Sequence, residues 1–157
     1  CGHGPGGRGL KPAGGVGNFD ILPHTADVGF RATGSSLADL FQTAAVAMFS
    51  VEYDLSGVSF EEEAALECQG EDLEATLYAW LSELLWLHDA EAFVPGEVMV
   101  DEVVEEAEGW RVRGAIRGRR LSDWFVQLGP QLKAVTMHEL AVRQVGEAFE
   151  ATVYLDV

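Results

Sequence analysis

The sequence predicts an α+β fold in which two helices pack on a mainly antiparallel sheet, forming a single-domain sandwich. Two long stretches, 35–48 and 71–89, carry apolar residues at helical spacing. The other apolar segments alternate with polar residues as strands do, without the regular strand–helix repetition of parallel sheets. A length of 157 residues, 48% of them apolar, suits one domain with a sizeable core.

The N-terminal segment differs in composition from the rest of the chain. Residues 1–17 hold eight glycines and two prolines and show no apolar periodicity. Such a segment buries too little surface to offset its loss of conformational entropy. We therefore expect a flexible extension over 1–17 and a folded domain over 18–157. Alternating residues then predict two short strands, at 19–21 and 28–32.

The first helix follows these strands. Serines and an aspartate at 35–39 form a helix start of the capping-box kind, and the apolar stripe that follows extends to Met48. Downstream, residues 64–68 alternate between apolar and polar types, which predicts a half-buried strand. Gly70 is expected to end that strand.

The second helix starts directly afterwards. Its first turn, at 71–74, is acidic, as the helix dipole favours. Its apolar stripe over 73–87 is wide, which is typical of a helix largely covered by a sheet. We expect this helix to end near Asp89.

The C-terminal part is predicted to consist of strands. Segments 98–104 and 110–116 are expected to pair across an acidic turn at 105–109. A further strand is predicted over 132–142. The last, over 149–155, shows clean alternation up to the end of the sequence. The expected order is thus ββαβαββββ.

Composition limits the function classes. Ten basic and 26 acidic residues give a formal charge of −16, which argues against binding nucleic acid by phosphate neutralisation. The longest uncharged stretch, Leu40–Val51, is shorter than the roughly 20 residues that span a bilayer. Cys1 and Cys68 have no metal-ligand spacing and form no disulfide framework, so we expect a protein of the reducing cytoplasm without a membrane segment.

Charge is also segregated along the chain. Residues 32–110 contain 19 acidic residues and no Lys or Arg, and five arginines then crowd into 111–120. The acidic region is either a solvated surface or a surface for a basic partner. The arginine cluster could touch RNA held by a partner, although a solvated strand face is the favoured interpretation.

Two places could hold a cation. Asp27 lies in the segment His-Thr-Ala-Asp-Val-Gly, where a loop becomes a strand, and its carboxylate could bind a hard cation, act as a base or cap its own turn. Asp156 and Val157 place a side-chain and a terminal carboxylate one residue apart. Such anionic groups repel each other unless a cation lies between them. Considered separately, a turn at Asp27 and a solvated pair at the chain end are both favoured.

Lys133 and two histidines are further candidates. Lys133 is the only lysine after Lys11, and it could neutralise carboxylates, contact a partner or extend into solvent. His88 and His138 could be bases or metal ligands, although a structural role is favoured. The sequence shows no glycine-rich phosphate loop, Cys-x-x-Cys or His-Glu-x-x-His motif. It therefore does not predict an obvious catalytic site.

Five segments together resemble the archease family, in the family's order and across the whole expected domain. They are Phe-Asp-Ile-Leu-Pro-His-Thr-Ala-Asp-Val-Gly-Phe at 19–30, Leu-Phe-Gln-Thr-Ala-Ala-Val-Ala-Met-Phe at 40–49, Trp-Leu-Ser-Glu-Leu-Leu-Trp-Leu-His-Asp at 80–89, Lys-Ala-Val-Thr-Met-His at 133–138 and Tyr-Leu-Asp-Val at 154–157. The resemblance implies an α+β fold and an accessory role without catalysis. Archeases assist the GTP-dependent RNA ligase that joins tRNA halves, by promoting guanylylation of the ligase and multiple turnover. RNA would then be a partner only indirectly.

The resemblance also implies a metal site. Family members bind a divalent cation, Ca²⁺ in known cases, through the motif aspartate and the last two residues. Carried over, the ligands are Asp27, Asp156 and Val157. These residues can share an ion only if folding brings the two parts of the chain together, as it would if their strands pair.

Contact with the ligase is the second implied role. The motif lysine corresponds to Lys133, and His24 and His138 are further candidates for partner binding. Two positions depart from the family pattern. Met137 stands where an aromatic residue, usually Tyr, is expected, so this chain lacks that ring. Pro23 stands where an acidic residue is common, which removes one possible outer-shell carboxylate.

Two other function classes remain open from the sequence. A metal-dependent hydrolase would use the carboxylates to hold a catalytic ion, with His24 or His138 as base, and would turn over substrate without a partner. A plain adaptor would dock basic proteins through its acidic surface, and its binding would be salt-sensitive but would survive chelation.

Overall fold

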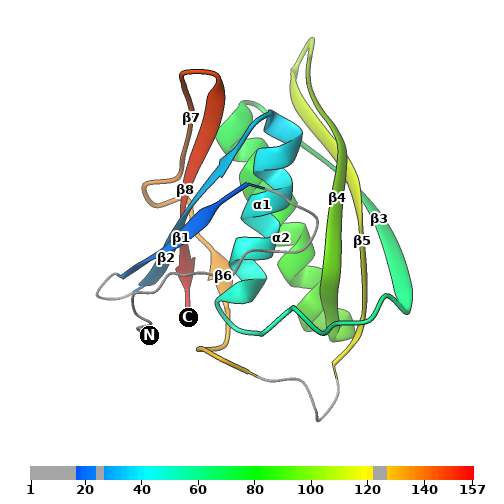
Figure 1. Ribbon diagram of the computed structural model, residues 1–157. Coiled ribbons are helices and arrows are strands. Elements are labelled where there is room, and N and C mark those ends of the chain that lie inside the picture. The colour runs from blue at the N-terminus through cyan, green and yellow to red at the C-terminus, as the bar shows by residue number, and fades with distance from the viewer. Residues whose placement is uncertain (1–16, 24–26, 122–126) are drawn as a thin grey trace.

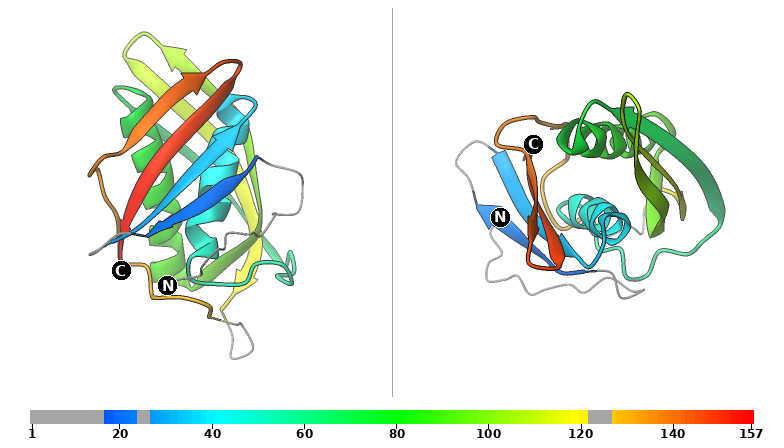
Figure 2. Two further views of the ribbon diagram at one scale, coloured as in Figure 1. Left: turned by 60° about the vertical axis from the view of Figure 1, so that its left-hand side comes forward. Right: turned by 90° about the horizontal axis from the view of Figure 1, so that it is seen from above.

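The protein folds as three layers, with two helices lying between two antiparallel sheets (Figures 1 and 2). The structure is a computed structural model, and it describes residues 17–23, 27–121 and 127–157. The α+β class is confirmed, and the elements follow the order ββαβαβββββ. The predicted antiparallel strands do not form one sheet but divide between two, so that each helix is covered on both sides.

The first sheet contains both ends of the described chain. Its path runs β1 (Phe19–Pro23), β2 (Asp27–Gly34), β8 (Ala148–Asp156) and β6 (Ala134–Val135), and β7 (Ala141–Val145) also pairs with β8. All of these pairings are antiparallel. In consequence, β8 lies in the middle of the sheet.

The second sheet has β5 (Gly109–Arg120) between β3 (Glu62–Gly70) and β4 (Phe93–Glu106). β4 and β5 form the predicted hairpin. Gly109 begins the return strand with a φ of 142°, a conformation that favours glycine.

Both helices begin at a capping side chain, which the sequence predicts for the first helix; for the second, it predicts only an acidic first turn over 71–74. In α1 (Leu37–Ser50) the Ser36 hydroxyl accepts a hydrogen bond from the Asp39 N–H at 3.0 Å. In α2 (Leu73–Glu91) the Asp72 carboxylate accepts from the Ala75 N–H at 2.8 Å. These bonds satisfy amide groups that have no partner within the helix.

The core fills the space between the layers. The Trp80 indole is fully buried and donates a hydrogen bond to the Phe41 carbonyl oxygen at 3.2 Å, which links the two helices. Buried side chains reach the helices from both sheets; they include Phe30, Val153 and Leu155 from the first and Val98, Val112 and Ile116 from the second. None of the helices in the described part of the chain is long and apolar enough to cross a bilayer.

One predicted strand is interrupted. The segment expected as a single strand over 132–142 forms β6 and β7, separated by a turn in which Glu139 has a φ of 52°. The turn allows both short strands to pair with the long β8. The expected flexible extension lies outside the described residues, apart from Gly17.

Candidate functional site

The two ends of the domain meet in the ladder between β2 and β8. Asp27 is the direct partner of Asp156, and Val28 is the partner of Leu155. Asp156 is exposed, whereas Leu155 is fully buried. The condition that the two strands pair is therefore confirmed for the backbone. The side chain of Asp27 lies outside the described part of the structure.

A third segment joins on the other side of β8. Ala134 of β6 is also a partner of Asp156, and the Lys133 N–H donates a hydrogen bond to the Asp156 carbonyl oxygen at 2.9 Å. Val157 follows, half-buried against the core. The fold thus brings four of the predicted site residues together: Asp27, Lys133, Asp156 and Val157.

Of the two histidines expected to bind the partner, His24 and His138, the structure describes only His138. His138 is exposed on the turn after β6; its Nε2 lies 3.2 Å from a carboxylate oxygen of Glu139, and its ring centroid lies 6.1 Å from that of Tyr154. It is therefore beside the site rather than within it. His24 lies outside the described residues, as do its predicted contacts.

Tyr154 packs across the neighbouring strand near the site. A Cβ atom at Gly29 would lie 2.4 Å from the Tyr154 ring. Because Gly29 is the ladder partner of Tyr154, only glycine leaves room for the ring in this position. The glycine of the sequence motif thus has a packing role two residues from Asp27.

Lys133 differs from the other cations in its electrostatic surroundings. Each arginine that the structure describes lies within 4.0 Å of a carboxylate; these are Arg31, Arg111, Arg113, Arg117, Arg119, Arg120 and Arg143. Among the same described residues, no carboxylate forms an ion pair with Lys133. Within the described part of the chain, this distinguishes Lys133 from every arginine.

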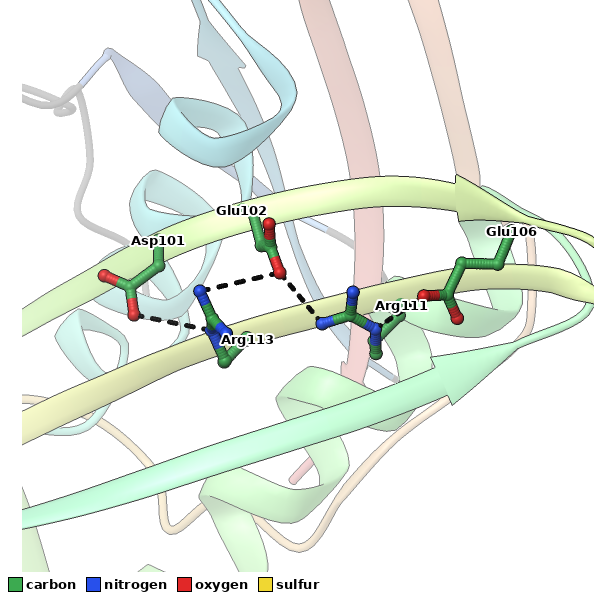
Figure 3. Close-up of polar contacts among 5 residues, drawn as sticks. All are labelled: Asp101, Glu102, Glu106, Arg111 and Arg113. Atoms are coloured by element: carbon green, nitrogen blue, oxygen red, sulfur yellow. Dashed lines mark hydrogen bonds and ion pairs between the residues drawn. The ribbon is translucent and has the colours of Figure 1, made fainter.

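The arginine cluster forms an ion-pair ladder on the outer face of the second sheet (Figure 3). Arg111 lies 2.9 Å from both Glu102 and Glu106, and Arg113 lies 3.5 Å from Glu102 and 3.8 Å from Asp101. Hydrogen bonds to Glu106 and Glu102 raise the pKa of Arg111. Since neighbouring strands supply carboxylates, this face is not a free basic surface for RNA. The structure therefore favours the solvated-face interpretation.

A small pocket lies next to Lys133, between α2 and β6. Its volume is about 160 Å³, and its walls include Tyr78, Trp86, Asp89, Lys133 and Ala134. Trp86 is 56% exposed. This pocket is not apparent from the sequence. The sequence feature that could have indicated the pocket is Trp86, a tryptophan outside the apolar stripe of α2.

The oxygen atoms at the strand ends suit a hard cation such as Ca²⁺ or Mg²⁺. Among the side chains that the structure describes, no group of three or more His, Cys, Asp or Glu could hold a metal ion. The predicted set draws one ligand from Asp27, whose side chain is not described, and one from Val157, which is not of these residue types. The metal site therefore stays a prediction.

Comparison with known proteins gives the family. The model of the Archease protein family matches residues 19–157. Protein archease of Archaeoglobus fulgidus is 41% identical over 139 residues, which cover 88% of this chain and 98% of the relative. Protein archease of Methanosarcina acetivorans is 32% identical, with coverage of 88% and 95%.

Solved structures agree with the fold. The solution structure of a Methanobacterium thermoautotrophicum protein has a TM-score of 0.77 at 34% identity and covers 88% of this chain and 98% of its own. The crystal structure of an archease from Thermotoga maritima, described as a possible chaperone, has a TM-score of 0.58 at 20% identity, with coverage of 97% and 100%. The sequence relatives establish more than a shared fold: this chain belongs to the archease family.

Proposed function

We propose that this protein is a non-catalytic activator of the GTP-dependent tRNA-splicing RNA ligase in the cytoplasm. In this role it binds a divalent cation and promotes guanylylation of the ligase, which then completes many rounds of RNA joining. The observation that carries the proposal is the pairing of Asp27 with Asp156, because it places the predicted metal ligands on adjacent strands beside Lys133.

The two aspartates that face each other in the ladder between β2 and β8 favour a bound cation. Residues directly opposite each other in an antiparallel pair have Cβ atoms about 4.5–5.5 Å apart, and like charges there are destabilising. A divalent ion held by Asp27, Asp156 and a main-chain oxygen of Val157 would remove this repulsion. Ca²⁺ takes about six to eight oxygen ligands, so such a site leaves positions for water or for a group of the partner.

Lys133 supplies the contact with the partner. It is a cation without an ion pair among the described residues of a chain with a formal charge of −16. Its main chain is hydrogen-bonded to Asp156, one of the residues proposed to hold the ion. A metal ion and an ammonium group side by side would together attract an anionic surface of the ligase.

The test is ligation of tRNA halves with the ligase at limiting concentration, with and without this protein. We expect the wild type to raise the number of joined products per ligase molecule, and Asp27→Ala to abolish this increase. Asp20→Ala is the matched control, since Asp20 is an exposed aspartate of the neighbouring strand β1. Unchanged ligase turnover with the wild type, or equal activity of Asp27→Ala, would overturn the proposal.

A further inference from the structure

A buried carboxylate lies behind the segment that carries Lys133. Glu52 is 3% exposed, and it is the only Asp or Glu that is buried among the side chains the structure describes. No arginine or lysine of that described set forms an ion pair with it. Burying a charged carboxylate is costly unless hydrogen bonds replace the lost water. The position of Glu52 therefore calls for a specific set of hydrogen-bond donors.

Those donors come from the strip of chain that precedes Lys133. The Glu52 Oε1 atom accepts a hydrogen bond from the Leu132 N–H at 3.1 Å. The Glu52 carbonyl oxygen accepts from the Leu128 N–H at 2.7 Å and from the Gly129 N–H at 3.4 Å. One residue at the end of α1 thus holds this strip at three points, and the side chain makes the bond nearest to Lys133.

The next hydrogen bond along the strip belongs to the candidate site. After Leu132, which is 2% exposed, the Lys133 N–H donates to the Asp156 carbonyl oxygen. The main chain at Lys133 is therefore fixed on one side by Glu52 and on the other by β8. Loss of the first bond would leave Lys133 attached to β8 alone.

A buried network continues from Glu52 through Tyr53 to His88. The Tyr53 hydroxyl is hydrogen-bonded to the Glu52 side chain and lies 2.8 Å from Nε2 of His88. A hydroxyl has one proton to donate, so the bond from Tyr53 to Glu52 requires His88 to donate from Nε2. Nδ1 of His88 lies 3.5 Å from a carboxylate oxygen of Asp89 but has no hydrogen-bond partner among the described residues, so the network ends at His88.

We propose that Glu52 is a positioning residue that fixes the Lys133 segment for contact with the ligase. The inference rests on the proposed function for the role of Lys133, but the structural part stands on the hydrogen bonds alone. Glu52 does not touch the partner. It acts by holding the main chain through Leu132, so that the lysine side chain starts from a fixed point.

The chain offers a matched control for this role. The Glu74 carboxylate also accepts a hydrogen bond from a distant main-chain N–H, that of Val142 in β7, at 3.0 Å. Replacing either glutamate with alanine removes one hydrogen bond from a carboxylate to a distant main-chain N–H: Glu52 follows α1 and binds the strip before β6, whereas Glu74 lies in α2 and binds β7. Only the bond of Glu52 lies next to Lys133.

The first experiment needs no ligase. Amide hydrogen exchange is measured on Glu52→Ala, Glu52→Gln and Glu74→Ala. We expect the Leu132 and Lys133 amides to exchange at least about tenfold faster in Glu52→Ala, the effect of losing a buried hydrogen bond. Glu52→Gln keeps an acceptor oxygen and should stay near the wild type. Glu74→Ala should affect Val142 only. Unchanged exchange at Leu132 and Lys133 in Glu52→Ala would overturn the inference.

The second experiment asks whether Glu52 acts through Lys133. Ligase activation is compared for Glu52→Ala, Lys133→Ala and the double variant, with Glu74→Ala and Glu52→Gln as controls. We expect each single alanine variant to lower activation, the double variant to be no worse than Lys133→Ala, and both controls to remain near the wild type. If the two losses of ligase activation multiply in the double variant, Glu52 acts independently of Lys133. Its role would then be merely structural, and the inference would be wrong. Full activity of Lys133→Ala would instead overturn the proposed role of Lys133.

Discussion

Asp27 lies directly opposite Asp156 in the ladder between β2 and β8, although the two residues stand at opposite ends of the domain sequence. The Asp156 carbonyl oxygen also accepts the Lys133 N–H from the other side of β8. Three distant segments therefore converge on one residue. A site built in this way forms only when the first sheet is complete, so any ligand that binds there would be coupled to folding.

Ca²⁺ binding should depend on both aspartates. We expect Asp27→Asn and Asp156→Asn to weaken Ca²⁺ binding at least about tenfold, because each removes a charged oxygen ligand. Isothermal titration calorimetry measures the affinity, with Asp20→Asn as the control on β1. Ca²⁺ at about 100 times its Kd should also stabilise the wild type by about 2.7 kcal/mol, a shift that the two site variants lose. Equal affinity in all four proteins would contradict the proposed ligand set.

Substitution of Lys133 should separate partner binding from metal binding. We expect Lys133→Ala to raise the concentration for half-maximal ligase activation about tenfold, the effect of losing a central charged contact. Its Ca²⁺ affinity should stay the same, since the Lys133 side chain is not a ligand. Arg143→Ala is the control, because Arg143 is exposed and already paired with Glu150 at 2.8 Å. A parallel loss of activation in Arg143→Ala would indicate a general charge effect instead.

The arginines of the ion-pair ladder should contribute little to RNA-dependent association with the ligase. Arg113 is about half exposed and pairs with Asp101 and Glu102, so Arg113→Ala should cost only about 0.2–1 kcal/mol of unfolding free energy. Arg113→Glu should leave RNA-dependent association with the ligase unchanged, because the arginine is neutralised within its own sheet. Urea denaturation and a co-sedimentation assay with tRNA halves measure these two quantities. Reduced association in Arg113→Glu would favour an RNA contact.

Stability should fall on mild acidification because of His88. Burial lowers the pKa of His88 below its ordinary value of 6.5, although Glu52 and Asp89 oppose this shift. The unfolded chain then takes up a proton near pH 6.5 that the folded protein does not, so stability is lost as pH falls from about 6.5 toward the lower folded value. His88→Gln should show a smaller loss over this range when urea unfolding is followed at several pH values. A steeper loss in His88→Gln would contradict the argument.

Most of the fold could be predicted because its signals are local. The cap of the first helix, the acidic start of the second and the alternation before Gly70 depend on neighbouring residues, and the structure confirms them. The division into two sheets could not be predicted in this way. It depends on which strands pair across long stretches of sequence, and an alternating pattern does not identify the partner strand.

The candidate site, like the fold, could be predicted only in part. The sequence motif and the family resemblance pointed to Asp27, Asp156 and Lys133, and the ladder brings their backbones together. Glu52 was missed because a glutamate after a helix is usually exposed, and its burial depends on the strip at 128–132 folding over it. The ion pairs of the arginine cluster could not be predicted from the sequence either, because the carboxylates that pair with these arginines lie on neighbouring strands.

The most direct measurement is a crystal structure of the protein soaked in Ca²⁺, with anomalous scattering used to locate the ion. We expect one ion between the side chains of Asp27 and Asp156, within about 2.3–2.6 Å of their oxygen atoms and in contact with a main-chain oxygen of Val157. A protein saturated with Ca²⁺ that shows no ion there, or carboxylates turned away from each other, would contradict the account.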